Sequence, residues 1–198
     1  MNISIRITLV LILSSLLVCG CELFTTRDPQ PPDGANGGGW QFPSEPRTVL
    51  DNLSESVGRR SSVDYLRSFA TSDVGLPEMR FVADPGSAAN YPGLFDDWGI
   101  RQETAFVGSL FSSSNLPLDS LSELTLDMQR TQVLGDSALI TAQYSLHLGH
   151  LRESAPRVVS GRFDFEILRG NDGGWYVQLW SDYRNEGQAC WSDLKAQF

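Results

Sequence analysis

The fold of this chain is decided by the stretch FDFEIL (163–168), which is followed by GNDGG (170–174) and WYVQLW (175–180). Apolar and polar residues alternate over 163–168, which is typical of a strand with one face on a core and the other in water. The Asn-Asp-Gly-Gly run after it predicts a tight hairpin turn. Residues 175–183 are apolar on both faces, so we expect this last strand to be central in the sheet or covered.

Two further runs with a period of two precede this hairpin. They cover 124–128 and 138–146, and Gly135-Asp136 turns the chain between them. The four runs together predict an antiparallel meander. Its side chains predicted to face inward are Leu124, Leu126, Met128, Ala138, Ile140, Ala142, Tyr144, Leu146, Phe163, Phe165 and Ile167.

Upstream of the meander the apolar pattern takes the period of helices. Helices are predicted over 48–57, over 62–69 with Val63, Leu66 and Phe69 inward, and over 100–111. Residues 79–83 are a short strand candidate that Asp84-Pro85-Gly86 ends. This order predicts an α+β domain in which helices pack on one face of a curved antiparallel sheet.

Four sequence motifs accompany this order of elements. They are WGIRQE (98–103), LF (110–111), WYVxxWxD (175–182) and WSDLK (191–195). With them, residues 46–198 resemble the nuclear transport factor 2-like fold, which ketosteroid isomerase-like and polyketide-cyclase-like proteins share, and are similar to bacterial lipoproteins within it. The resemblance implies a cone-shaped sheet packed against three N-terminal helices, and it implies no reaction. The alternative is another helix-on-sheet sandwich.

The first twenty residues are predicted to be a signal peptide. The run 7–18 is apolar, and it is shorter than the ~20 residues that a transmembrane helix needs. It leads into Val18-Cys-Gly-Cys21, which resembles the lipobox of bacterial lipoproteins. The resemblance implies cleavage after residue 20, a lipid on Cys21 as membrane anchor and, with Glu22 next, delivery to the outer membrane. The alternative is an ordinary secretory signal with a coincidental cysteine.

Residues 21–46 are the predicted tether between the lipid and the domain, which we expect over 47–198. The tether is rich in Pro and Gly, which propagate neither helix nor sheet. Trp40 and Phe42 are its exceptions. They either dock on the domain or stay exposed.

Composition excludes several classes of function. The chain has 15 Lys and Arg against 24 Asp and Glu, a net charge of −9, and no basic stripe, so we expect no nucleic-acid partner. Three Cys and two His without a Cys-x-x-Cys motif give no metal site, and no cofactor motif is present. Once Cys19 is removed and Cys21 is lipidated, Cys190 remains as the lone thiol. We expect it to be buried, and the alternative is a reactive thiol.

The sequence offers no clear constellation of catalytic residues. We expect His147 and His150 at the surface. Glu103 is expected to favour the N-terminal dipole of its helix. Asp182 is expected to pair with a neighbour such as Arg184.

The candidate rim of a pocket at the mouth of the cone is formed by Trp98, Tyr144 and Trp180. Tyr144 is predicted to be a hydrogen-bonded core tyrosine. Because most inward residues are large, we expect a filled cone and a pocket below the ~300 Å³ typical of ligand sites.

Three functions are compatible with these features. We predict a non-catalytic envelope module that binds a partner protein. The alternatives are a binder of small molecules or lipids that uses the cone pocket, and an enzyme of the dehydratase or isomerase type. A hollow cone would favour the second function, and a buried acid facing it would favour the third.

Overall fold

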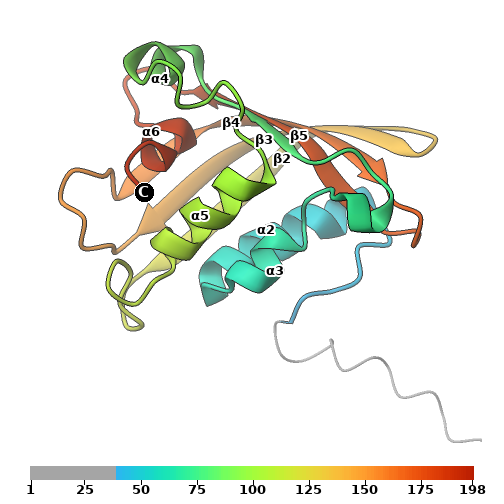
Figure 1. Cartoon of the computed structure of the whole chain (residues 1–198), viewed down its shortest axis with the longest axis horizontal. Coiled ribbons are helices and arrows are strands. Elements are labelled where there is room, and N and C mark those ends of the chain that lie inside the picture. The colour runs from blue at the N-terminus through green and yellow to red at the C-terminus, as the bar shows by residue number, and fades with distance from the viewer. Residues whose placement is uncertain (1–38) are drawn as a thin grey trace, which may run out of the picture. The chain divides into compact units, whose positions relative to one another are not determined.

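The computed structural model describes residues 39–198, in which helices pack on a five-stranded sheet (Figure 1). The predicted signal peptide, the lipobox with Cys21 and most of the tether lie outside these residues. No helix within 39–198 is long and apolar enough to span a bilayer.

The sheet has the strand order β1-β5-β4-β3-β2. Its members are β1 (Arg80–Val82), β2 (Ser122–Leu134), β3 (Ser137–Leu148), β4 (Val158–Arg169) and β5 (Trp175–Arg184). Strands β2 to β5 form the predicted antiparallel meander, and β1 adds to β5 in parallel. β5 therefore lies between two strands, as its apolar character on both faces predicted.

Two irregularities bend this sheet. The register shifts between Met128 and Arg130 in β2 and between Glu166 and Ile167 in β4. Such shifts increase the local twist of a strand. The inward positions predicted on β3 and β4 are buried, whereas Leu126 and Met128 are only half-buried. Beyond the shift, residues 129–134 of β2 are exposed.

Three helices pack with the sheet where the sequence predicted them: α2 (Pro46–Arg59), α3 (Ser62–Leu66) and α5 (Ile100–Leu110). α2 begins at Pro46 because proline is preorganised for a first helical position. α3 is shorter than predicted, because the chain after it bonds to β5: Val177 N–H donates to the Ser68 carbonyl oxygen at 2.9 Å. Val63 lies within α3 but is 68% exposed, so its predicted inward position is wrong, while Phe69 is buried beyond the helix end.

Three short helical segments have no counterpart among the predicted elements. They are the 3-10 turn η1 (Ser72–Val74), α4 (Pro85–Asn90) and α6 (Trp191–Lys195). Asp84-Pro85-Gly86 ends β1 as expected, but it also starts α4. The Asp84 carboxylate caps this helix by accepting hydrogen bonds from the backbone N–H groups of Gly86 and Ser87.

Contacts with the domain start at Trp40, several residues before the expected boundary. The backbone of Gln41 exchanges two hydrogen bonds with the Asn52 amide, of 2.9 and 2.6 Å. Trp175 N–H donates to the Pro43 carbonyl oxygen at 2.9 Å. The Arg67 guanidinium lies 4.0 Å from the centroid of the Trp40 ring. Trp40 thus docks on the domain, while Phe42 remains 50% exposed.

A chain that begins at Ser44 should still melt cooperatively, since all helices and strands of the domain remain. We expect its free energy of unfolding to fall by about 2 kcal/mol, because buried Asn52 loses both partners. Calorimetry against a chain that begins at Gly39 measures the difference. Loss of cooperative melting would contradict this prediction and place Trp40 to Pro43 in the core.

Candidate functional site

A buried ion pair between Glu103 and Lys195 lies at the centre of the domain. Glu103 comes from the first turn of α5 and Lys195 from the last turn of α6, and both side chains are fully buried. The carboxylate also accepts hydrogen bonds from the Tyr65 hydroxyl at 2.6 Å and the Trp98 indole N–H at 2.7 Å. Three donors therefore surround one carboxylate.

Aromatic rings surround the Lys195 ammonium on its other sides. Its Nζ lies 4.2 Å from the ring centroid of Phe81, 4.8 Å from that of Phe106 and 4.9 Å from those of Trp98 and Trp180. Burial lowers the pKa of Lys195 to about 8, and the charge of Glu103 opposes that shift. Ring faces attract a cation, so the cage also favours the charged lysine. The lysine therefore carries its charge at neutral pH.

Tyr65 completes this cluster as a donor. Burial, and then the charge of Glu103, raise the pKa of Tyr65 well above its usual value. The hydroxyl therefore keeps its proton and donates a hydrogen bond to the Glu103 carboxylate.

A second buried carboxylate, Asp182 on β5, binds the start of α6. It accepts hydrogen bonds from the Ser192 backbone N–H at 2.7 Å, the Ser192 hydroxyl at 2.6 Å and the Tyr144 hydroxyl at 2.8 Å. Burial raises the pKa of Asp182, and these hydrogen bonds oppose the rise. The Tyr144 hydroxyl in turn accepts a hydrogen bond of 2.7 Å from the Trp191 backbone N–H. The prediction that Tyr144 is a hydrogen-bonded core residue is confirmed.

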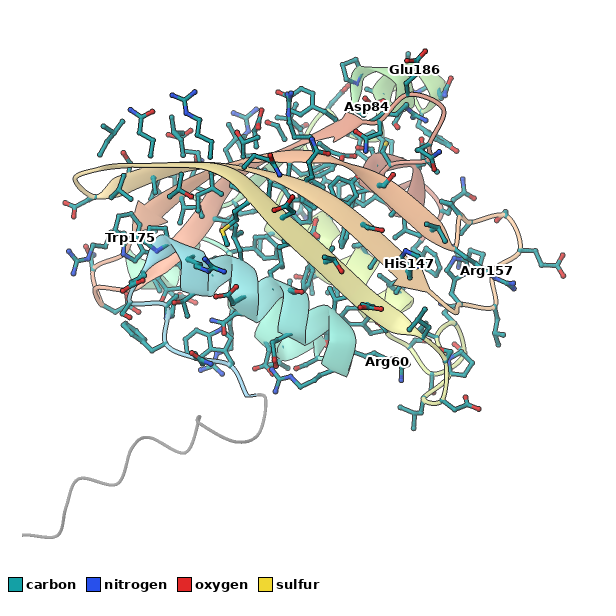
Figure 2. The ribbon with its side chains drawn as sticks, turned by 180° about the vertical axis from the view of Figure 1, so that it is seen from behind. Arg60, Asp84, His147, Arg157, Trp175 and Glu186 are labelled. Atoms are coloured by element: carbon teal, nitrogen blue, oxygen red, sulfur yellow. The ribbon has the colours of Figure 1, made fainter. Side chains whose placement is uncertain are left out.

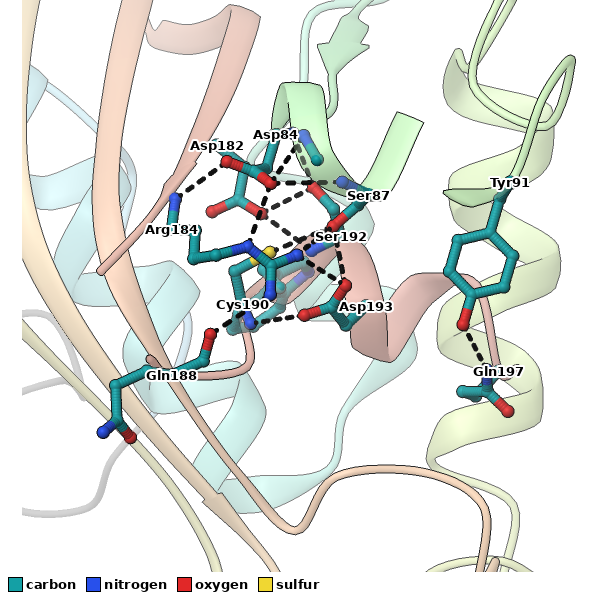
Figure 3. A network of polar contacts seen from close by, with 12 residues as sticks. Asp84, Ser87, Tyr91, Asp182, Arg184, Gln188, Cys190, Ser192, Asp193 and Gln197 are labelled. Carbon is teal, nitrogen blue, oxygen red and sulfur yellow. Dashed lines mark hydrogen bonds and ion pairs between the residues drawn. The ribbon is translucent and has the colours of Figure 1, made fainter. Parts of the chain in front are cut away.

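The expected pairing of Asp182 with Arg184 is wrong. Arg184 lies at the end of β5 and reaches α4 and α6, where it pairs with Asp84 at 3.1 Å and with Asp193 at 2.9 Å (Figure 3). Asp182 faces the interior and is 1% exposed. The two side chains therefore belong to separate parts of the network around α6.

Cys190 lies in the same network and is buried, as expected. Its sulfur is 3.3 Å from the Ser87 hydroxyl oxygen (Figure 3). Burial raises the pKa of the thiol to about 12. Because the thiolate is the reactive form, this cysteine is chemically inert at neutral pH.

The arrangement of the two buried carboxylates limits their chemistry. A general acid or base must come within hydrogen-bond reach of a substrate atom. The oxygens of Glu103 and Asp182 instead accept hydrogen bonds from Tyr65, Trp98, Lys195, Tyr144 and Ser192. Both carboxylates thus hold α6 in place, which is a structural role.

The three residues of the candidate rim lie in the packed interior. Trp98, Tyr144 and Trp180 are 6%, 4% and 0% exposed, and the Tyr144 ring stacks on Phe163 with 3.7 Å between centroids. Trp98 also borders a surface pocket of about 400 Å³ beside the C-terminal end of α6. The structure therefore does not bring these three residues together at one opening.

The side chains predicted to face into the cone from β3 and β4 are buried, and the larger pockets lie at the surface. Besides the pocket of about 400 Å³, one of about 390 Å³ lies over β2 to β5, with Leu139 and Glu166 in its lining. A third, of about 600 Å³, lies between Trp40, α3 and the β4–β5 hairpin. The expected limit of ~300 Å³ applies to the volume inside the cone, and pockets at the surface do not test it.

The two histidines differ in environment. His147 is exposed near the end of β3, as expected (Figure 2). His150 is fully buried, so its expected surface position is wrong: its Nε2 lies 3.0 Å from the Pro156 carbonyl oxygen, and its ring contacts Phe198 edge-on. Hydrogen bonds from Gly149 N–H to Leu121 and from Leu151 N–H to Asn115 fix this loop on the domain.

The role of Glu103 is larger than expected. It lies in the first turn of α5, where it favours the helix dipole, but it also forms an ion pair with Lys195. The sequence contains a pattern that could have indicated this cluster of buried charges. Each of the motifs WGIRQE, WYVxxWxD and WSDLK combines tryptophan with a charged residue. The structure brings Glu103, Asp182 and Lys195 from these three motifs to α6. Within 39–198, no group of three or more His, Cys, Asp or Glu side chains is placed to hold a metal ion.

Comparisons with known proteins agree with this architecture. No protein-family model matches the chain, and neither does any curated protein. A ketosteroid isomerase-like protein from Erwinia carotovora is 9% identical, with a TM-score of 0.50 over 70% of this chain and 92% of that one. A conserved protein from Planctomyces limnophilus is 15% identical, with a TM-score of 0.52 over 69% and 91%.

A nuclear transport factor 2-like superfamily protein from Salmonella enterica is 14% identical, with a TM-score of 0.48 over 70% of this chain and 89% of that one. The domain has the nuclear transport factor 2-like α+β fold, and the predicted fold class is confirmed. Identities this low show the fold alone.

Replacing Lys195 with methionine should lower the free energy of unfolding by about 3–5 kcal/mol, because Glu103 is left charged and unpaired in the interior. The double variant with Glu103→Gln should recover much of that loss. Chemical denaturation of the two single variants and the double variant gives the coupling energy.

Arg47→Met is the matched control, because the Arg47–Asp51 pair is 70% and 60% exposed. An exposed pair of this kind is worth less than ~1 kcal/mol. If Lys195→Met costs no more than Arg47→Met, the buried pair does not hold α6.

Proposed function

We propose that this protein is a lipid-anchored lipoprotein of the bacterial cell envelope whose folded domain is a non-catalytic binding module. One observation carries the second half of this proposal: the carboxylates inside the cone are occupied by donors of the protein itself. A domain without a free acid or base in its interior binds through its surface.

The lipobox supports the first half of the proposal. Val18-Cys-Gly-Cys21 directly follows the apolar run 7–18, and the Pro- and Gly-rich residues after it suit a spacer between a bilayer and a domain. Two or more acyl chains on one cysteine hold a protein firmly to a membrane. Glu22 favours the outer membrane as the destination. A partner protein of the envelope is the proposed ligand of such a module.

Binding of a small molecule is the second candidate function. The surface pocket of about 600 Å³ favours it, since ligand pockets have volumes of ~300–1,000 Å³. An isomerase-type activity has less support. The name of the ketosteroid isomerase-like neighbour does not extend to this chain at 9% identity, and one fold hosts many unrelated functions.

Substituting Cys21 with serine should abolish incorporation of labelled palmitate and leave an uncleaved precursor, because the acylated sulfur is missing. Cys19→Ser is the matched control and should be labelled like the native chain. Metabolic labelling followed by membrane fractionation measures both. A Cys21→Ser chain that still takes up label and stays with the outer membrane would contradict the anchor.

A further inference from the structure

The pocket of about 600 Å³ lies where the predicted tether meets the domain, and we call it the tether pocket. Trp40 and Phe42 form one wall, and these rings meet edge-on with 6.4 Å between centroids. Phe69 and Tyr176, both buried, form the floor. Aromatic side chains from three separate segments thus enclose one volume.

Backbone hydrogen bonds fix each wall of the tether pocket. Three backbone hydrogen bonds of 2.9 Å do this. Trp175 N–H donates to the Pro43 carbonyl oxygen. Ala70 N–H donates to the Val177 carbonyl oxygen, and Asn171 N–H donates to the Val74 carbonyl oxygen. These three hydrogen bonds connect the β4–β5 region to the segment that follows Trp40 and to the chain after α3. A preformed pocket loses little conformational entropy when a ligand binds.

Positive charge at the rim of the tether pocket is already paired. The Arg67 guanidinium lies over the Trp40 ring and is 3.6 Å from the Asp64 carboxylate. This arginine therefore has an anionic partner and an aromatic face within the protein.

Two carboxylates of the same lining, those of Asp73 and Asp172, form no ion pair within residues 39–198. Asp73 forms no hydrogen bond or ion pair recorded within residues 39–198. The Asp172 carboxylate accepts hydrogen bonds from the Tyr176 hydroxyl at 2.6 Å and the Gly174 N–H at 3.0 Å, which are neutral donors. Among the described residues, these two exposed carboxylates therefore have no ion-pair partner beside the aromatic side chains.

We propose that the tether pocket binds a small organic cation with an apolar or aromatic body. The rings of Trp40, Phe42 and Tyr176 contact the body, and the carboxylates of Asp73 and Asp172 face the cationic group. Aromatic faces and carboxylates both attract cations, whereas an anion would meet two like charges. A small organic cation would be the ligand of the non-catalytic binding module, so the proposal rests on that half of the proposed function and not on the lipid anchor.

The full chain in phosphatidylcholine vesicles can be titrated with 2-phenylethylammonium while tryptophan emission is recorded. We expect saturable quenching that Phe42→Leu weakens, since this variant removes an aromatic wall and keeps the Trp40 fluorophore. The neutral analogue 2-phenylethanol should bind about fivefold more weakly or worse, and phenylacetate more weakly still. Asp73→Asn should weaken binding of the amine about threefold to fivefold, the size of effect that an exposed charge supplies.

Asp119→Asn is the matched control, because it removes the same charge from an exposed position outside the pocket. Equal binding of the alcohol and the amine, binding that Phe42→Leu leaves unchanged, an Asp73→Asn effect no larger than that of Asp119→Asn, or the absence of saturable binding would each overturn the proposal. The titration does not depend on the lipid, so its failure would leave the result for Cys21 unchanged.

Discussion

The pairing of Lys195 with Glu103 is the interaction on which the rest of the domain depends. Taking two charges out of water costs several kcal/mol per ion, which only good geometry and further hydrogen bonds offset. Tyr65 and Trp98 supply those hydrogen bonds, and four ring faces surround the ammonium. Because Lys195 belongs to α6, its pairing with Glu103 holds this five-residue helix against the interior of the domain.

α6 is held at both ends, and this determines what the cone can do. Asp182 and Tyr144 bind its first residues, while Glu103 binds its last. With Trp191 and Leu194 fully buried, the helix fills volume that would otherwise be a cavity. Within residues 39–198 the interior of the cone is closed around its own side chains. The tether pocket is a part of the surface with both an apolar floor and carboxylates that form no ion pair within these residues.

The meander, three helices and the filled core could be predicted from the sequence, because each has a period that repeats over several residues. α4 and α6 could not, since neither belongs to a longer apolar pattern. α3 is equally short, but its apolar pattern continues over 62–69, beyond the helix end. Glu103 and Lys195 are 92 residues apart, and no local pattern pairs such residues. Sequence proximity instead suggested Arg184 as the partner of Asp182, which the structure does not show. The tether pocket could not be predicted for the same reason, because its walls come from three segments that are distant in the sequence.

Hydrogen exchange of the Trp98 indole N–H, measured by NMR and assigned with Trp98→Phe, tests the closed interior most directly. This proton is bonded to Glu103 in a fully buried cluster. It should therefore exchange only when the whole domain unfolds, with a protection free energy equal to that of global unfolding. Exchange many orders of magnitude faster than global unfolding would show that the cone opens around Glu103 in the folded state. That result would contradict the structural role of the ion pair.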